Sequence, residues 1–195
     1  MLEVVLAPLE FETRPLEHVL TEDERRRAAA FAFDRDRRRF IVARARLRQL
    51  LGERVGAAPE SVELIYKANG KPELAPGHSR DLRFNVAHSG ELAVYAFADG
   101  AEVGIDVEAL REFEDADAIA ARAFSPAEHQ AYRAFGFFYC WTRKEAYLKA
   151  LGIGLGEGLR VLDTSCLPRG WRVESFAPMP GFVAALAVGE RGVPA

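Results

Sequence analysis

The chain carries, at residues 92–108, the run LAVYAFADGAEVGIDVE, which decides the fold. Apolar side chains fill both alternating sets of positions in residues 92–98, so this segment is predicted to be a strand covered on both faces. Asp99-Gly100 follows, and this residue pair is favoured in tight hairpin turns. Apolar residues then recur at every second position over residues 103–107. The run is therefore predicted to form a hairpin of two neighbouring strands.

Upstream of this run the sequence predicts a strand, helices and a turn. Residues 2–6 are mostly apolar and read as a short strand. Thr21 and Glu24 have the spacing of a capping box, in which each side chain satisfies a backbone donor at the start of a helix. Residues 40–51 carry apolar side chains at helical spacing, with arginines on the other faces. Residues 62–66 alternate like a strand and lead into the turn signal Asn69-Gly70-Lys71-Pro72.

Downstream of the run the pattern is again mixed. Ser125 and Glu128 mark a second capping box, with proline at the first helical position. A long helix is predicted from Tyr139 to Leu151, ending at Gly152. Late strands are predicted at Val161, at Trp171 and Val173, and over residues 182–188. Strands and helices thus occur in both parts of the chain without regular alternation, so the predicted fold class is α+β.

Composition excludes several classes of protein. The chain has 195 residues, 49% of them hydrophobic and 28% charged, which is typical of a folded globular protein. Its net charge of −3 argues against general nucleic-acid binding, although the arginines concentrate in residues 25–48. Such a local basic patch suits a small phosphorylated ligand. The apolar run at residues 182–188 is much shorter than the ~20 residues that span a bilayer. With no leader at the first residues, the expected location is the cytoplasm.

Two carboxylates on the predicted strand suggest a metal site. Because side chains alternate along a strand, Asp106 and Glu108 lie on the face opposite Val103, Ile105 and Val107. Two neighbouring carboxylates repel each other unless a cation lies between them, and oxygen ligands favour Mg²⁺ or Ca²⁺. The alternative is a half-exposed strand with two solvated acids.

The long helix and one histidine supply further candidates. Trp141, Glu145 and Lys149 lie close to one stripe of the helix, which places a metal ligand one turn from a phosphate partner. The alternative is an ordinary surface ion pair. His88 has no second histidine at ligand spacing, so zinc is not expected, and a structural hydrogen bond is its alternative role.

Four motifs together resemble the 4′-phosphopantetheinyl transferases, in particular the larger single-chain type that activates surfactin synthetase and other peptide synthetases. They are Gly70-Lys71-Pro72, Phe84-Asn85-x-x-His88-Ser89, Gly104-Ile105-Asp106-Val107-Glu108, and Trp141-x-x-Lys144-Glu145-x-x-x-Lys149-Ala150-x-Gly152-x-Gly154-Leu155. Ala87 departs from the family pattern, in which many members have serine at this position. The resemblance implies two similar α+β halves with a pseudo-two-fold relation, each a small, mostly antiparallel sheet packed on helices. Residues 1–100 would form the half that contacts coenzyme A, and residues 101–195 the half with the metal site and the catalytic helix.

The resemblance also implies roles for individual residues. It assigns Mg²⁺ to Asp106, Glu108 and Glu145. It makes Glu145, or a water that Glu145 orients, the general base. It implies that Lys149 neutralises the pyrophosphate or assists the leaving group. The remaining coenzyme A contacts that it implies are Arg44 near the adenosine 3′-phosphate, Lys71 in a nucleotide-contacting turn, and His88 and Ser89 on phosphates.

The function implied is Mg²⁺-dependent transfer of 4′-phosphopantetheine from coenzyme A to a serine of an apo acyl or peptidyl carrier protein, with release of 3′,5′-ADP. A monomer is expected, with no nucleic-acid or membrane partner. One alternative is a catalytically idle module that binds coenzyme A or a carrier protein. A second alternative is a Mg²⁺-dependent nucleotidyl or phosphate hydrolase that uses the same acids.

Overall fold

The computed structural model describes the chain from residue 1 to residue 190 except residues 68–69, 79–80, 155–158 and 160–161; residues 191–195 also lie outside the description. The elements before residue 100 are β1 (Leu2–Pro8), η1 (Arg14–Val19), α1 (Glu22–Ala29), α2 (Asp34–Val55), η2 (Pro59–Ser61), β2 (Leu64–Tyr66), β3 (Pro72–Leu74), β4 (Leu82–Ser89) and β5 (Leu92–Asp99). The elements after it are β6 (Ala101–Ala109), α3 (Ala116–Ala123), α4 (Pro126–Phe135), α5 (Phe137–Leu151), β7 (Trp171–Phe176) and β8 (Phe182–Glu190). The predicted α+β class is confirmed.

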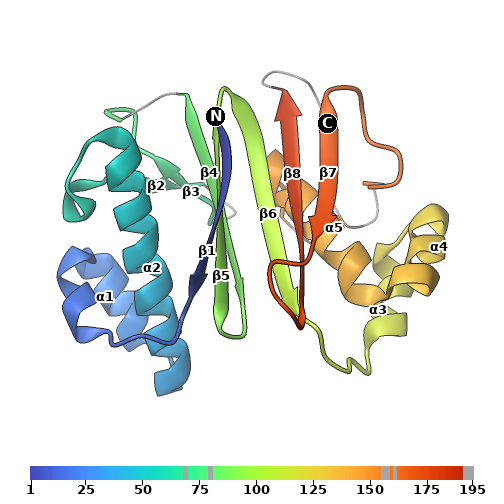
Figure 1. Ribbon diagram of the computed structural model, residues 1–195, viewed down its shortest axis with the longest axis horizontal. Helices are drawn as coiled ribbons and strands as arrows, with labels where there is room; N and C mark the ends of the chain where they lie inside the picture. The colour runs from blue at the N-terminus through green and yellow to red at the C-terminus, as the bar shows by residue number, and fades with distance from the viewer. Residues whose placement is uncertain (68–69, 79–80, 155–158, 160–161, 191–195) are drawn as a thin grey trace.

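The strands form three antiparallel sheets. The first sheet has the order β1-β5-β4, the second is the pair β2-β3, and the third has the order β6-β8-β7. The first and third sheets face each other, with α2 packed outside the first and α5 outside the third (Figure 1). The main elements therefore lie in four layers, helix, sheet, sheet and helix.

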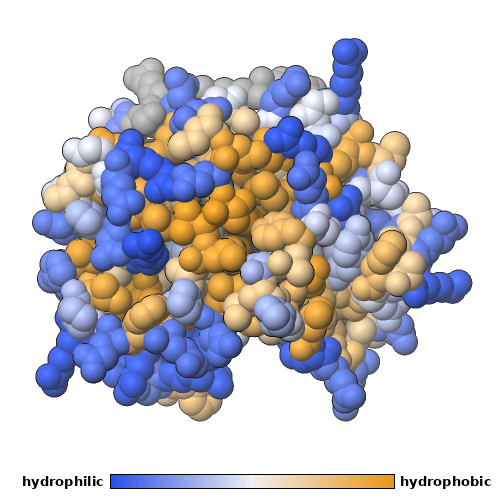
Figure 2. All heavy atoms as spheres, viewed as in Figure 1, coloured by the Kyte–Doolittle hydropathy of each residue, from blue (hydrophilic) through white to orange (hydrophobic). Residues whose placement is uncertain are grey.

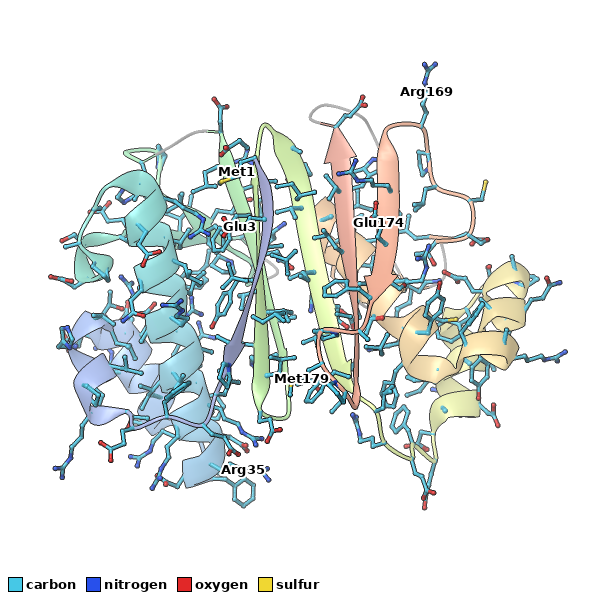
Figure 3. The ribbon with its side chains drawn as sticks, in the orientation of Figure 1. Met1, Glu3, Arg35, Arg169, Glu174 and Met179 are labelled. Atoms are coloured by element: carbon cyan, nitrogen blue, oxygen red, sulfur yellow. The ribbon has the colours of Figure 1, made fainter. Side chains whose placement is uncertain are left out.

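The central strand β5 is covered on both faces, as predicted. Residues 93–97 are completely buried. Tyr95 and Phe97 belong to the core against α2, whereas Val94 and Ala96 belong to the core between the two large sheets. Side chains from both sheets stand in the space between them in Figure 3. The β5 sequence has no alternation of polar and apolar residues because both faces of the strand are buried against apolar layers.

The predicted hairpin across Asp99-Gly100 is wrong. The chain does reverse there, with Gly100 at φ +68°. However, β5 forms its ladders with β1 and β4, and β6 forms its ladder with β8. Both edges of β5 are thus occupied, and β6 meets it through side chains of the shared core. The Asp-Gly pair predicts a tight turn but carries no information about which strand edges will pair.

The helix starts follow the sequence closely. Both capping boxes are present, at Thr21 with Glu24 and at Ser125 with Glu128. Helix α5 ends at Gly152, which adopts the left-handed conformation at φ +71°. None of the helices within the described ranges is long and apolar enough to cross a membrane.

The remaining predictions are mostly confirmed. The strands predicted at residues 2–6, 62–66, 171–173 and 182–188 correspond to β1, β2, β7 and β8, although β2 begins only at residue 64. Val161, Asn69 and Leu155 fall outside the described residues. Apolar residues gather over the strands at the centre of the face in Figure 2, while charged residues cover the N-terminal helices at lower left.

Candidate active site

Strand β6 places two of the predicted carboxylates beside helix α5. Asp106 is 6% exposed, whereas Glu108 lies further along the strand and keeps partial contact with solvent. Glu145, on α5, is 8% exposed. The alternative of solvated surface acids is therefore excluded for Asp106 and Glu145.

A close approach between strand and helix brings these residues together. A Cβ atom on Gly104 would lie 2.1 Å from the Ala146 carbonyl oxygen and 2.4 Å from the Ala150 amide nitrogen. Only glycine permits the helix backbone to lie directly against the strand at this point. The result is an ion pair in which Lys149 Nζ donates to Asp106 Oδ1 at 2.6 Å. The sequence motif contains Gly104, but its role as the contact point becomes visible only in the packed structure.

Burial and mutual repulsion shift the pKa values of the carboxyl groups. Burial raises the pKa of Asp106 to about 6, in spite of the opposing effect of the Lys149 ammonium, and Glu108 raises it further. Burial likewise raises the pKa of Glu145 to about 7, with Lys149 opposing and with Asp106 and Glu108 adding to the rise. The three carboxyl groups therefore share one electrostatic environment, and Glu145 is close to half-protonated at neutral pH.

The carboxylate oxygens of Asp106, Glu108 and Glu145 are of the kind that a hard divalent cation prefers, although the three side chains do not converge on one point. Within the described ranges no three Asp, Glu, His or Cys side chains adopt a metal-holding arrangement. Instead Asp106 pairs with Lys149 and Glu108 accepts a hydrogen bond from Ser89. Asp106 Oδ2 is buried and has no hydrogen-bond partner among the described residues. An unsatisfied buried carboxylate oxygen, in a cluster whose charges repel, fits a Mg²⁺ ligand set.

Ser89 joins the carboxylates to the first sheet. Its hydroxyl donates to Glu108 Oε2 at 2.8 Å and accepts from the Ala109 amide at 3.0 Å. Arg111 also lies 3.4 Å from the same oxygen of Glu108. The Ser89 hydroxyl is thus engaged in holding β6 and Glu108.

His88 and Lys71 bring further cationic or donor groups to the end of α5. Partial desolvation lowers the pKa of His88, although the residue keeps an exposed edge, and the positive charges of Lys149 and then Arg39 lower it further. Lys71 Nζ donates to the carbonyl oxygen of Lys149 at 2.6 Å. Burial lowers the pKa of Lys71 to about 8. The structure therefore brings Lys71 against the backbone of Lys149, and places His88 within electrostatic range of the Lys149 ammonium.

Arg44 belongs to a second group of cations on the N-terminal helices. Its side chain is 11% exposed and its Nε lies 3.6 Å from Glu24 Oε1. The guanidinium groups of Arg44 and Arg27 both lie within 6 Å of the Phe40 and Tyr66 ring centroids. Arg44 Nη1 is buried without a hydrogen-bond partner among the described residues. A cavity of about 890 Å³ opens beside them, lined in part by Arg27 and Tyr66.

Exposure separates the arginines of α2 into those that are solvated and those that face the interior. The Arg35 side chain is 71% exposed and points away from the sheets in Figure 3. Arg39 is 24% exposed and Arg48 only 2%. Among the arginines of α2, Arg39 is the one whose charge lowers the pKa of His88. Arg27 and Arg39 are the site residues that the sequence did not single out, because the arginines of residues 25–48 are indistinguishable before packing selects among them.

These features together indicate a general class of protein. They describe an α+β protein in which buried carboxylates and a lysine lie at one end of a helix, with an arginine and aromatic recess on the N-terminal helices. Such a combination of acids, which a divalent cation can neutralise, and inward-facing cations is typical of proteins that act on phosphorylated ligands.

Comparison with known proteins makes the assignment specific. Residues 7–99 match the family model described as "4′-phosphopantetheinyl transferase, N-terminal", and residues 102–179 match the model of the 4′-phosphopantetheinyl transferase superfamily. The chain is 36% identical to the 4′-phosphopantetheinyl transferase HetI of Nostoc sp., an alignment that covers 92% of this chain and 82% of that relative. The chain belongs to the 4′-phosphopantetheinyl transferase superfamily, a family of transferases.

More distant relatives are longer. The chain is 31% identical to a phosphopantetheinyl transferase of Thraustochytrium sp. over 79% of this chain and 60% of the relative. It is 30% identical to the human L-aminoadipate-semialdehyde dehydrogenase-phosphopantetheinyl transferase over 75% of this chain and 52% of that protein. The chain thus spans little more than half the length of these two relatives.

Proposed function

We propose that this chain transfers the 4′-phosphopantetheine moiety of coenzyme A to a serine of an apo acyl or peptidyl carrier protein and releases 3′,5′-ADP. It would act as the larger, single-chain type of the family, with residues 1–100 and 101–195 as two halves. The observation that carries the proposal is the buried group of Asp106, Glu145 and Lys149, in which a carboxyl group with a pKa of about 7 lies beside an ammonium. Family membership supplies the reaction class.

The proposed transfer exchanges one bond at phosphorus for another. The serine hydroxyl oxygen forms a bond to the phosphorus that bears pantetheine, while the bond from this phosphorus to the bridging oxygen breaks. The serine loses its proton, and 3′,5′-ADP leaves with the electron pair of the broken bond. Phosphoryl transfer of this kind depends mainly on positioning and on stabilisation of negative charge.

Glu145 is the group best suited to accept the serine proton, directly or through a water that it orients. Burial and the neighbouring carboxylates raise the pKa of Glu145 in the metal-free site, which makes it a stronger base than an ordinary glutamate. Lys149 then lies one helical turn away, where its ammonium is available to the pyrophosphate or to the departing oxygen. In the ligand-free chain Asp106 holds this ammonium at 2.6 Å.

Mg²⁺ held by Asp106, Glu108 and Glu145 would supply the positive charge that lets the acidic site accept a pyrophosphate. Lys71, which bonds the Lys149 carbonyl oxygen, is proposed to contact the nucleotide, and His88 a phosphate, while Ser89 fixes Glu108. Arg44 and Arg27 are proposed to receive the 3′-phosphate in the recess beside Tyr66. Arg44 Nη1, buried without a partner among the described residues, supports this assignment.

The two alternatives explain less of the molecule. An idle binding module does not need a carboxyl group with a pKa of about 7 beside a lysine at the end of α5. A hydrolase would need a means of directing water onto the phosphate, and the relatives of this chain are named as transferases.

The proposal is tested by incubating the protein with coenzyme A, Mg²⁺ and a panel of apo carrier proteins, and measuring the intact mass of each carrier. We expect at least one carrier to gain the mass of phosphopantetheine. EDTA should stop the reaction and excess Mg²⁺ should restore it. Tight binding of coenzyme A with every carrier unmodified would contradict the proposal and favour the idle module.

The chain is also proposed to act as a monomer, because both large sheets and the site between them come from one chain. Light scattering coupled to size-exclusion chromatography measures this directly, and a stable dimer would contradict it.

A further inference from the structure

Strand β6 is joined to the first sheet by side chains in place of a backbone ladder. The Ile105 amide donates to Asn85 Oδ1 at 2.9 Å, and the Ala109 amide donates to Ser89 Oγ at 3.0 Å. Both pairs join β4 to β6 and are offset by the same number of residues along the chain. The two strands therefore run in the same direction in a fixed register, although they belong to different sheets.

Lys71 adds a third contact along the same edge of β6. Its ammonium lies 3.5 Å from the Val103 carbonyl oxygen, in addition to its bond to Lys149. Backbone groups of alternate residues point to the same edge of a strand, so residues 103, 105 and 109 all present theirs to the first sheet. We refer to Lys71, Asn85 and Ser89 as the side-chain ladder.

The side-chain ladder brackets the candidate metal ligands. Asp106 and Glu108 lie between the two β4 contacts, at residues 105 and 109. Ser89 bonds the Glu108 side chain directly, whereas Asn85 accepts its hydrogen bond from the backbone amide of Ile105. Asn85 is 5% exposed, so water cannot readily replace it as the acceptor.

We propose that Asn85 is a positioning residue, which sets the register of β6 against β4 so that Asp106 and Glu108 lie opposite the phosphate-binding residues of the first sheet. This role rests on the proposed function for its catalytic consequence. Without the Asn85 oxygen the buried Ile105 amide has no acceptor, and only the contacts of Ser89 and Lys71 at residues 109 and 103 still resist a shift of β6 along β4. A misplacement of ~1 Å in a transfer site is enough to reduce the rate about 100-fold.

The test compares two substitutions that each remove one buried side-chain hydrogen bond from the first sheet. Asn85→Leu removes the acceptor for Ile105. Tyr95→Phe is the matched control, because the Tyr95 hydroxyl donates to the Ala43 carbonyl oxygen at 2.9 Å on the face toward α2. Both variants should lose a few degrees of thermal stability. Only Asn85→Leu should lose turnover, about 100-fold, with its KM for coenzyme A changed less than about twofold.

Two further measurements separate positioning from general destabilisation. Asn85→Asp retains an oxygen acceptor, so it should keep more turnover than Asn85→Leu even though a buried carboxylate makes it less stable. Amide hydrogen exchange of residues 103–109 should quicken in Asn85→Leu and stay unchanged in Tyr95→Phe. If Asn85→Leu does not fold, Asn85→Ser, whose shorter side chain withdraws the oxygen from Ile105, takes its place.

Wild-type turnover and unchanged exchange in a folded Asn85→Leu protein would overturn the proposal. Loss of turnover in Tyr95→Phe equal to that in Asn85→Leu would do so as well. Failure of the proposed function is distinguishable, because it would appear as an inactive wild-type protein. Hydrogen exchange and the heat of coenzyme A binding would then still report whether Asn85 holds β6.

Discussion

The two large sheets are each backed by a long helix, but the contact between helix and sheet differs. Helix α2 rests on the first sheet through large side chains, among them Leu47, Leu50, Tyr95 and Phe97. Helix α5 lies against β6 and β8 through small residues, which are Gly104, Ala146, Ala150, Ala185 and Ala187, and its large side chain Tyr147 packs on Trp171 of β7. The distance between packed elements depends on the side chains at the contact. The smaller residues therefore let the polar side chains of α5 reach those of β6, and the chemistry lies where the packing is closest.

The capping boxes of the two halves differ in a related way. Glu128 accepts four hydrogen bonds, from the Ser125 amide, from Lys144 Nζ, and from the amide and hydroxyl of Thr164. Glu24 bonds the Thr21 amide and Arg48 Nε, and its Oε1 has no hydrogen-bond partner among the described residues. The C-terminal cluster is closed and structural. The N-terminal cluster keeps unsatisfied polar atoms beside the recess, as expected where a ligand completes the network.

The largest expected effect is the loss of turnover on substitution of the carboxylates between β6 and α5. Glu145→Gln removes the proposed base and one proposed metal ligand, so turnover should fall by about 10²–10⁴-fold in the carrier-protein mass assay. Asp106→Asn should lose most turnover for the same reason, while Glu108→Gln is expected to be milder. Full turnover of Glu145→Gln at limiting Mg²⁺ would remove Glu145 from the site.

The C-terminal cluster around Glu128 is tested by Lys144→Met, which leaves the buried Glu128 carboxylate without its cation. The free energy of unfolding in urea should fall by about 3–5 kcal/mol. Arg44→Met is the matched control, because it removes a cation from the N-terminal cluster while Arg48 still pairs with Glu24 at 2.6 Å. Equal losses in the two variants would show that the N-terminal cluster is as closed as the other.

Close packing itself is tested by Gly104→Ala. The added methyl group would lie 2.1 Å from the Ala146 carbonyl oxygen, so β6 and α5 must separate. Stability should fall by about 3 kcal/mol, and turnover should fall too because Lys149 moves away from Asp106. Gly77→Ala is the control, since its Cβ atom has open space around it. A Gly104→Ala protein with unchanged stability would contradict the packing argument.

The N-terminal cluster around Glu24 is tested by Arg44→Ala in binding calorimetry. Coenzyme A should bind more weakly by about 1.5–3 kcal/mol, whereas 3′-dephospho-coenzyme A should be much less affected. Equal weakening for both ligands would show that Arg44 does not contact the 3′-phosphate, and an unchanged affinity for both would show a purely structural arginine.

The smallest effect concerns the pH dependence of the metal-free protein. The pKa of Glu145 is raised from its ordinary 4.5 to about 7, so the folded state holds this proton more tightly than the unfolded state. The associated stability is present below pH 4.5 and is lost as the pH rises through 7. In EDTA, Glu145→Gln should flatten this part of the stability profile in urea titrations. An identical slope in the wild type and the variant would refute the raised pKa.

Local patterns in the sequence identified the family, both capped helix starts and several of the strands, but predicted neither β4 nor α3. Thr21 with Glu24 and Ser125 with Glu128 identified helix starts because a capping box is complete within four residues. The motifs around His88, Asp106 and Glu145 likewise carry the resemblance without reference to packing.

Tertiary structure decided everything that depends on which edges and faces meet. The Asp99-Gly100 signal predicted a hairpin, yet β5 and β6 lie in different sheets, because strand pairing is a competition among edges that no local pattern encodes. Packing also selected among chemically identical arginines: it buried Arg48, brought Arg44 to within 3.6 Å of Glu24 and left Arg35 in solvent. The raised pKa of Glu145 has the same origin, since burial and the charges of Asp106 and Glu108 exist only once β6 lies against α5.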